Sequence, residues 1–163
     1  EKISKACAEA LYMGIAHDTG VFQYSCTSPE TMEAAAQLLR KGIDGSEIIE
    51  KTYFEKTYIQ NQILGRALLE SMLVLEKQVV VSVVSRKEME FFEAVPSDLE
   101  GIVAQLRQTK GVEVAIFCMR RTPGSISQSA FQGQSQCKQY CSVFGGGGHV
   151  RAAGVTMKVL RTM

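Results

Sequence analysis

The 163-residue sequence lacks a strong excess of charge of either sign. Lysine and arginine number 18 and aspartate and glutamate 17, which gives a formal net charge of +1. A chain with this balance has no overall basic field to hold a long nucleic acid, so any anion has to be bound locally. The apolar share of 45% and the charged share of 21% are those of an ordinary globular domain and exclude a disordered chain.

Long apolar runs and paired cysteine motifs are also missing. No stretch approaches the roughly 18 apolar residues of a membrane-spanning helix, and no signal peptide is visible. The five cysteines are odd in number and show no CxxC spacing, which favours reduced thiols over a disulfide framework. Cys137 and Cys141 are four residues apart, but without a second pair at useful spacing they do not predict a metal site. We therefore expect a cytoplasmic protein with no membrane partner.

Apolar periodicity divides the chain into a helical beginning and an α/β remainder. Helices are expected over 2–16, 28–42, 46–53 and 57–72, and again over 86–92 and 98–108. Strands are expected over 79–85, which we predict to be buried on both faces, and over 112–119 and 154–160. The expected N-caps are Ser28, Ser46 and Ser97. The predicted fold class is α/β, with 1–52 helical and a compact α/β unit over 53–163.

The segment VFGGGGHVRAAG, residues 143–154, concentrates glycine before a histidine. Glycine is the costliest residue to order, but it adopts positive φ freely and lets a ligand reach backbone N–H groups. Successive N–H groups in such a turn form a nest for an anion, and HVRAAG is expected to form a helical turn whose N-terminus adds positive partial charge. The residues predicted to hold a phosphate are Gly146, Gly147, Gly148, His149 and Arg151. A flexible linker is the less favoured alternative.

The segment GIAHDTGVF, residues 14–22, places a carboxylate at the end of an apolar stretch. Asp18 suits a hard divalent ion such as Mg²⁺ or Mn²⁺, since these ions select oxygen ligands. On spacing alone, capping of a helix or turn by Asp18 is the favoured alternative, and one carboxylate cannot hold a catalytic metal. His17 is a second candidate ligand, although a lone histidine beside a turn is more often a surface residue.

Two further features of the sequence do not belong to either motif. Residues 120–141, RRTPGSISQSAFQGQSQCKQYC, are rich in Gln and Ser and do not alternate cleanly, and long structureless loops are uncommon in compact domains. The aromatic clusters Tyr53-Phe54-Tyr58 and Phe91-Phe92 are expected in the core rather than as base-stacking platforms, although the first lies near the junction of the two halves and could line a cleft.

Both motifs resemble those of one known family. FGGGGHVRAAG, residues 144–154, is similar to the GGGHxxAAG signature of the DHH-associated C-terminal domain. LYMGIAHDTGVFQYS, residues 11–25, resembles the last metal-binding motif of DHH-family phosphoesterases. Their order and spacing match the subgroup of exopolyphosphatase-related oligoribonucleotide and pAp phosphatases, the nanoRNases. The resemblance covers nearly all of the chain except 120–141, and it implies the helical end of a truncated DHH catalytic domain followed by a substrate-binding domain with a mixed sheet.

The resemblance also implies roles for particular residues. Asp18 matches a metal-ligating aspartate, one of several carboxylates and histidines that hold two Mn²⁺ ions in the family. His149 and glycines 146–148 match the loop that takes the substrate phosphate. In that family the metal pair activates a water that attacks phosphorus, and the C-terminal domain orients the substrate. The implied substrates are short oligoribonucleotides and pAp, and the sequence leaves open whether the protein forms a homodimer.

The sequence departs from the family in two ways. The Asp-His-His motif is absent and the chain begins at Glu1 in an apolar-periodic segment, so we expect a portion of a longer enzyme that alone hydrolyses nothing. Where relatives carry two strands with an arginine-bearing SLRS stretch, a shifted frame through the codons of 127–141 permits VSLRSKGKVNVSSIA. We therefore expect a frameshift, in the gene or in the written sequence, rather than divergence. The segment 120–141 should then be the least ordered part of the domain, with no substrate arginine near His149.

Three other functions compete with this hypothesis. A cyclic-dinucleotide phosphodiesterase and a RecJ-like single-strand exonuclease belong to the same superfamily, but the near-neutral charge disfavours a groove for a long strand. A non-catalytic nucleotide-binding module would use the glycine loop alone.

Overall fold

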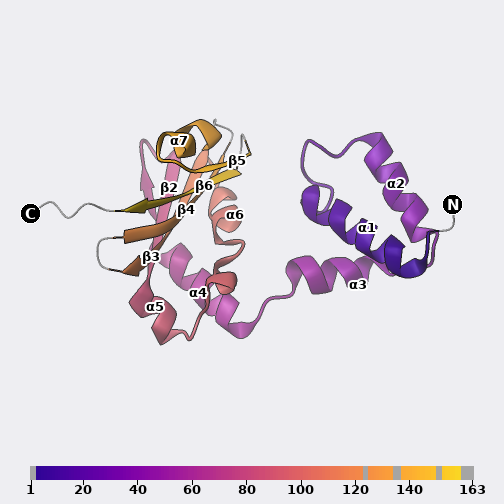
Figure 1. Cartoon of the computed structure of the whole chain (residues 1–163), viewed down its shortest axis with the longest axis horizontal. Coiled ribbons are helices and arrows are strands. Elements are labelled where there is room, and N and C mark those ends of the chain that lie inside the picture. The colour runs from indigo at the N-terminus through magenta and orange to yellow at the C-terminus, as the bar shows by residue number, and fades with distance from the viewer. Residues whose placement is uncertain (1–2, 123–124, 134–136, 150–151, 159–163) are drawn as a thin grey trace, which may run out of the picture. The chain divides into compact units, whose positions relative to one another are not determined.

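The computed structural model describes residues 3–122, 125–133, 137–149 and 152–158. The chain divides into two units, Glu1–Lys56 and Thr57–Met163 (Figure 1), and each is described by itself. The division lies four residues beyond the boundary expected from the sequence. Within the described residues, no helix is both long and apolar enough to cross a bilayer.

The first unit is helical. Its elements are α1 (Lys5–Asp18), α2 (Pro29–Leu39), α3 (Gly45–Ile49) and the π-helical η1 (Glu50–Phe54). Ser28 caps α2 with a proline in the first turn, as predicted. The expected cap of the third helix is wrong, because the Asp44 carboxylate, rather than Ser46, accepts the Glu47 N–H at 2.9 Å. A small core holds this unit together, formed by Ala8, Tyr12, Ala35, Leu38 and Ile43.

The second unit is built on a six-stranded mixed sheet in the order β1-β2-β3-β4-β6-β5. The strands are β1 (Met72–Val74), β2 (Val79–Ser85), β3 (Val114–Thr122), β4 (Ser125–Gly133), β5 (Gly147–His149) and β6 (Ala152–Lys158). The helical elements are α4 (Tyr58–Leu69), α5 (Arg86–Phe91), the 3-10 turn η2 (Pro96–Leu99), α6 (Ile102–Arg107) and α7 (Cys137–Val143). Among the strands that the structure describes, only β2 and β3 pair in parallel, and the chain between them passes through α5, η2 and α6. The expectation of an α/β fold with a mixed sheet is confirmed.

The core of the second unit lies between the sheet and two helices. Alternate residues of β2 and β3 point to this side and pack against α4 and α6, whose buried side chains include Ile63, Ile102 and Leu106. The residues that face the other way on β3 are in register with Ala153 and Val155 of β6, which pack with the buried cysteines of α7. Helix α7 therefore covers the opposite face of the sheet from α4 and α6.

Two expected elements differ in detail. The strand over 79–85 has the predicted bounds, but it is buried on one face only, since Val84 is inaccessible and Val83 is 42% exposed. The expected helix over 98–108 is broken by Gly101, whose φ of +86° separates η2 from α6. Asp98, rather than Ser97, accepts the N–H before this turn.

The expectation for residues 120–141 is wrong where the structure describes them. Strand β4 occupies Ser125–Gly133 and pairs with β3 on one side and β6 on the other, and α7 follows at Cys137–Val143. Strand β4 is thus interior to the sheet, neither disordered nor an edge. Because ladder hydrogen bonds join backbone groups, two open neighbouring strands can order a segment of weak β-propensity. The frameshift hypothesis stays a prediction, and the nucleotide sequence of the gene tests it.

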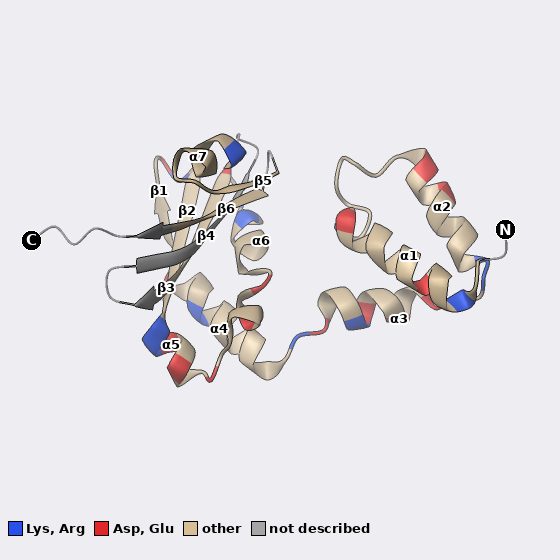
Figure 2. Cartoon of the chain, in the orientation of Figure 1, with Lys and Arg blue, Asp and Glu red and all other residues tan. Residues whose placement is uncertain are grey.

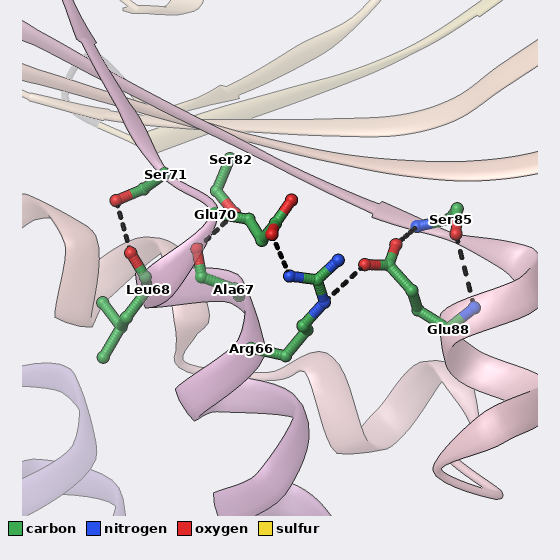
Figure 3. Close-up of polar contacts among 8 residues, drawn as sticks. All are labelled: Arg66, Ala67, Leu68, Glu70, Ser71, Ser82, Ser85 and Glu88. Atoms are coloured by element: carbon green, nitrogen blue, oxygen red, sulfur yellow. Dashed lines mark hydrogen bonds and ion pairs between the residues drawn. The ribbon is translucent and has the colours of Figure 1, made fainter.

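A polar bridge ties α4 to the end of β2 (Figure 3). The Arg66 guanidinium pairs with Glu70, the residue that follows α4, and with the Glu88 carboxylate on α5 at 2.8 Å. Glu88 also accepts the Ser85 N–H at 2.7 Å, while the Ser85 hydroxyl accepts the Glu88 N–H. Deeper in the unit, the Ser82 hydroxyl donates to the Ala67 carbonyl at 2.7 Å, which satisfies a polar group that is 1% exposed.

Neutralising Glu88 is expected to destabilise the second unit by about 1 kcal/mol, because a partly buried ion pair is lost while the cap survives. Burial raises the pKa of Glu88, but hydrogen bonds from Ser85 and the charge of Arg66 outweigh it and hold the pKa below its usual 4.5. The stabilisation is therefore present above about pH 4.5 and is lost as the pH falls through the folded-state pKa. Thermal unfolding of Glu88→Gln at pH 7 and pH 3 should show a difference from wild type only at pH 7. Glu90 serves as the control because it is exposed and pairs with Arg86. Glu90→Gln should leave the thermal unfolding unchanged at both pH values.

Candidate phosphate-binding loop and metal-binding aspartate

The four glycines of the loop have different structural tasks, and the first ends helix α7. Gly145 has a φ of +76°, its N–H donates to the Ser142 carbonyl, and the Gly146 N–H donates to the Cys141 carbonyl at 2.8 Å. These two bonds form a Schellman motif, which requires a left-handed residue after the helix. The N–H groups of Gly145 and Gly146 are therefore engaged by the protein itself.

Gly146 and Gly148 fit closely against β6. A Cβ on Gly146 would overlap the Gly154 carbonyl oxygen and lie 2.6 Å from Val155 Cβ. A Cβ on Gly148 would lie 2.6 Å from both the Ala152 oxygen and the Ala153 Cα, at a φ of +141°. Gly147 differs, because a Cβ there would meet nothing within 4 Å. Close packing thus explains two of the glycines, whereas Gly147 is exposed and has room for a side chain.

His149 lies in a strand and not at the start of a helix. Residues Gly147–His149 form β5, which pairs antiparallel with Ala152–Gly154, so the expected helical turn over HVRAAG is wrong. The small residues on both strands let the backbones approach closely, and this favours a ladder. His149 is exposed, and β5 is the last strand of the sheet, so part of its N–H row faces away from β6. Arg151 lies outside the described residues.

The register of the sheet separates the arginines of β3 from His149. His149 pairs with Ala152, which is in line with Gln132 of β4 and Ala115 of β3. Arg120 lies five residues farther along β3, or roughly 16 Å at the usual rise of a strand. The backbone of β3 therefore does not place Arg120 or Arg121 beside His149.

Asp18 is the last residue of α1, in the first unit. It is exposed, and no hydrogen bond or ion pair to its carboxylate is found among the described residues. Thr19 closes the helix instead, since its buried hydroxyl donates to the Ile15 carbonyl at 2.7 Å and accepts the Phe22 N–H at 3.0 Å. A carboxylate at a helix C-terminus opposes the helix dipole. Asp18 thus has no capping task here, and a bound cation would offset its unfavourable position.

The backbone after Asp18 is strained. Gly20, Val21 and Phe22 follow one another at φ values of 56°, 55° and 64°. A β-branched residue such as Val21 is rarely left-handed, and it is held here by its N–H, which donates to the Ala16 carbonyl at 2.7 Å. Strained turns of this kind gather at functional sites, where surrounding contacts impose them. The turn over 19–22 is therefore consistent with a functional site at the end of α1.

His17 and Asp18 border a shallow hollow of about 560 Å³ on α1, lined by Ala10, Leu11, Gly14, Ile15, His17 and Asp18. The Thr52 hydroxyl donates to the Ile48 carbonyl at 2.7 Å, so its oxygen accepts from His17 Nε2–H at 2.9 Å. This contact requires a proton on Nε2. His17 is therefore oriented by η1.

The described residues do not complete a metal centre. No group of three or more His, Cys, Asp or Glu side chains is gathered in the part of the chain that the structure describes. A pair of Mn²⁺ ions needs several such ligands, so the described residues supply at most part of the site. Cys137 and Cys141 are buried, and burial raises the pKa of both thiols, which disfavours the thiolate that a metal binds. None of the five cysteines, all of which lie in described segments, forms a disulfide.

Comparison with known proteins relates both motifs to one group. No family model matches the chain. The bifunctional oligoribonuclease and PAP phosphatase NrnA of Thermus thermophilus is 27% identical over 154 residues, and that of Bacillus subtilis is 22% identical over 156 residues. These matches cover 94% and 96% of this chain and 45% and 49% of the relatives. An exopolyphosphatase-related protein from Bacteroides fragilis superposes with a TM-score of 0.87 at 26% identity, over 95% of this chain and 46% of that one.

The sheet order, the two motifs and these similarities define the class of protein: the chain has the fold of the DHH family. This fold is nanoRNase-like, because the relatives that the chain resembles in sequence are NrnA proteins. The chain spans about half the length of these relatives. Asp18 belongs to the first unit and His149 to the second, as the motif order of the sequence suggested.

Proposed function

We propose that the full-length protein containing this chain is a metal-dependent phosphoesterase that hydrolyses short oligoribonucleotides and pAp. The observation that carries the proposal is the glycine loop, in which Gly147 needs no glycine for packing and opens its backbone beside the exposed His149. Both NrnA relatives are named for these two substrates. The loop would hold a substrate phosphate through backbone N–H groups of β5 and the imidazole, with Arg151 as an additional cation.

The charge of the second unit supports an anionic ligand. Residues 107–163 contain eight lysines and arginines and a single acidic residue, Glu113. Figure 2 shows basic positions in blue on α6 and α7, which carry Arg107 and Lys138. A local positive field raises the concentration of a small anion at the surface without the strong overall charge that long nucleic acids require. This distribution favours a short oligonucleotide over a long strand.

In this proposal Asp18 is one ligand of a manganese site whose other ligands lie outside the described residues. Manganese would supply Lewis acidity and an activated water when bound. The described residues contribute the exposed carboxylate, the rigid Thr19 cap beneath it and the oriented His17 beside it. We infer from the incomplete ligand set that this chain alone does not hydrolyse phosphoesters.

Truncation of His149 is expected to weaken substrate binding by about 1.5–3 kcal/mol, or roughly 10- to 150-fold, because a charge-assisted hydrogen bond to phosphate is lost. The measurement is the Kd and kcat/KM of the full-length His149→Ala variant for a dinucleotide, with Mn²⁺ content determined in parallel. Metal content should not change. Lys110→Ala removes an exposed cation of the same basic region and should alter the Kd less than twofold. Equal Kd values for wild type and His149→Ala would exclude a phosphate-binding role.

The proposal is tested directly by incubating the full-length protein with Mn²⁺ and either a dinucleotide or pAp. Release of mononucleotide and of phosphate is expected, and release of neither overturns the proposal. A cyclic-dinucleotide phosphodiesterase would instead cleave only a cyclic substrate.

One observation favours a second function for the isolated chain: with a phosphate loop and no described metal cluster, it would act as a nucleotide-binding module. That function requires binding without turnover.

A further inference from the structure

A partly exposed aromatic cluster contacts His17, the residue that precedes Asp18. Tyr53 contacts the His17 ring edge-on at a centroid distance of 5.6 Å and the Phe54 ring at 5.2 Å. Phe54 is 52% exposed and Tyr24 is 47% exposed. The expectation of a core position is therefore wrong for Phe54 and for Tyr58, which is 76% exposed, while Tyr53 is half-buried. We refer to His17, Tyr24, Tyr53 and Phe54 as the aromatic cluster.

Contacts with neighbouring residues fix the orientation of the rings in the cluster. The interplanar angles of 83° and 79° set each ring edge against the face of its neighbour. His17 is tied to Thr52, and Tyr24 packs on Gly20, where any Cβ would overlap its ring. Burial, followed by the charge and the hydrogen bond of Tyr24, raises the pKa of Tyr53. All of these contacts lie within the first unit.

Exposed, oriented aromatic rings are an unusual use of apolar surface. Phe54 and Tyr24 each forgo part of the roughly 1.5–3 kcal/mol that full burial of a large apolar side chain provides. Aromatic rings fixed near a phosphoester site commonly stack on nucleobases, because every base offers a π-face. His17 directly precedes Asp18 in the chain and borders the same hollow.

We propose that Tyr24, Tyr53 and Phe54 form a stacking platform for a nucleobase of the substrate, next to the carboxylate of Asp18. This assignment rests on the proposed function, because it requires a nucleotide substrate whose phosphoester lies near Asp18. The platform binds purines and pyrimidines alike, since stacking reads the face of a base and not its hydrogen-bonding edge. It therefore supplies affinity for a base beside the cleaved bond and leaves base identity unread.

The test is binding of a dinucleotide that contains the fluorescent base 2-aminopurine to the 163-residue chain. The chain has no tryptophan, so protein emission does not obscure the probe. Stacking quenches the probe, and Phe54→Leu should raise its Kd about tenfold and reduce the quenching. Tyr24→Leu should act in the same direction. The matched control is Phe91→Leu, which removes a 79% exposed phenylalanine in edge contact with Phe92 and should leave both readings unchanged.

The outcomes separate the two proposals. If the probe binds, inorganic phosphate competes with it, and Phe54→Leu matches Phe91→Leu, the stacking platform is wrong while the phosphate-binding function stands. If Phe54→Leu raises the Kd of the probe and leaves competition by phosphate unchanged, the platform is supported. If neither the probe nor phosphate binds the wild-type chain, the platform is overturned, and the hydrolysis assay on the full-length protein decides the proposed function separately. Circular dichroism of each variant verifies the fold, and Phe54→Tyr should restore quenching.

Discussion

Replacing Asp18 by Asn in the full-length protein is expected to lower the turnover of a dinucleotide by at least about a hundredfold, because even the outer partners of metal ligands contribute 10- to 100-fold. The free energy of unfolding should not fall. Thr19 closes α1 without help from Asp18, whose carboxylate has no partner among the described residues. Removing a negative charge from a helix C-terminus should instead stabilise the fold by about 0.3–1 kcal/mol. Loss of activity combined with unchanged or higher stability is typical of a residue kept for function.

The measurement is the rate of mononucleotide release at saturating Mn²⁺, together with thermal unfolding and calorimetric titration with Mn²⁺. Weaker Mn²⁺ binding should accompany the loss of turnover. Glu33→Gln removes an exposed carboxylate from α2 in the same unit and should change none of these quantities. A wild-type rate in Asp18→Asn would show that Asp18 is not a metal ligand.

Replacing Gly146 by Ala is expected to destabilise the second unit by about 3 kcal/mol, at the upper end of the range for overpacking. The added methyl group would overlap the Gly154 carbonyl and press on Val155, and neither of these can rotate away as a flexible side chain would. Relief requires β5 and β6 to separate or the end of α7 to shift, which breaks the bond from the Gly146 N–H to Cys141. Chemical denaturation, with the slope and midpoint fitted together, measures the change.

Gly147→Ala is the matched control, because the same methyl group one residue later meets nothing within 4 Å. Its unfolding free energy should stay within about 0.5 kcal/mol of wild type. If the loop binds phosphate, Gly147→Ala should nevertheless weaken nucleotide binding, since a side chain would stand where the ligand approaches the backbone. Destabilisation by Gly147→Ala equal to that of Gly146→Ala would contradict the division of tasks among the glycines.

Local patterns were sufficient for much of the secondary structure. The β-branched run over 79–85 is a strand with the bounds expected, and Ser28 with Pro29 begins α2 as predicted. Such features depend on backbone and side-chain preferences within a few residues, which the sequence displays directly. The predicted caps Ser46 and Ser97 are wrong because a neighbouring aspartate accepts the backbone N–H group instead. Asp44 does so at α3 and Asp98 at η2.

The candidate site residues could be selected from sequence, but the tasks of their neighbours could not. The sequence shows four consecutive glycines and does not distinguish them. In the fold, Gly146 and Gly148 lie in close contact with β6, while Gly147 has room for a side chain. Tyr53 and Phe54 were visible as an aromatic cluster, but the association of Tyr24 with them was missed, because Tyr24 is 29 residues from Tyr53 and nothing in either segment shows that they interact. Exposure of an aromatic ring depends on what else packs against it, and a sequence pattern does not contain that information.

The sequence by itself determined the α/β class, the helical beginning, the position of several helices and strands, and the two motifs that relate the chain to DHH phosphoesterases. The tertiary structure alone decided that β4 lies between β3 and β6, that HVRAAG begins in a strand, and that Thr19 and not Asp18 closes α1. The physical reason is the range of the interactions. Periodicity and capping act within one or two turns of chain, whereas a sheet joins backbones from distant segments, so its open edges can order residues that carry no strand signal of their own.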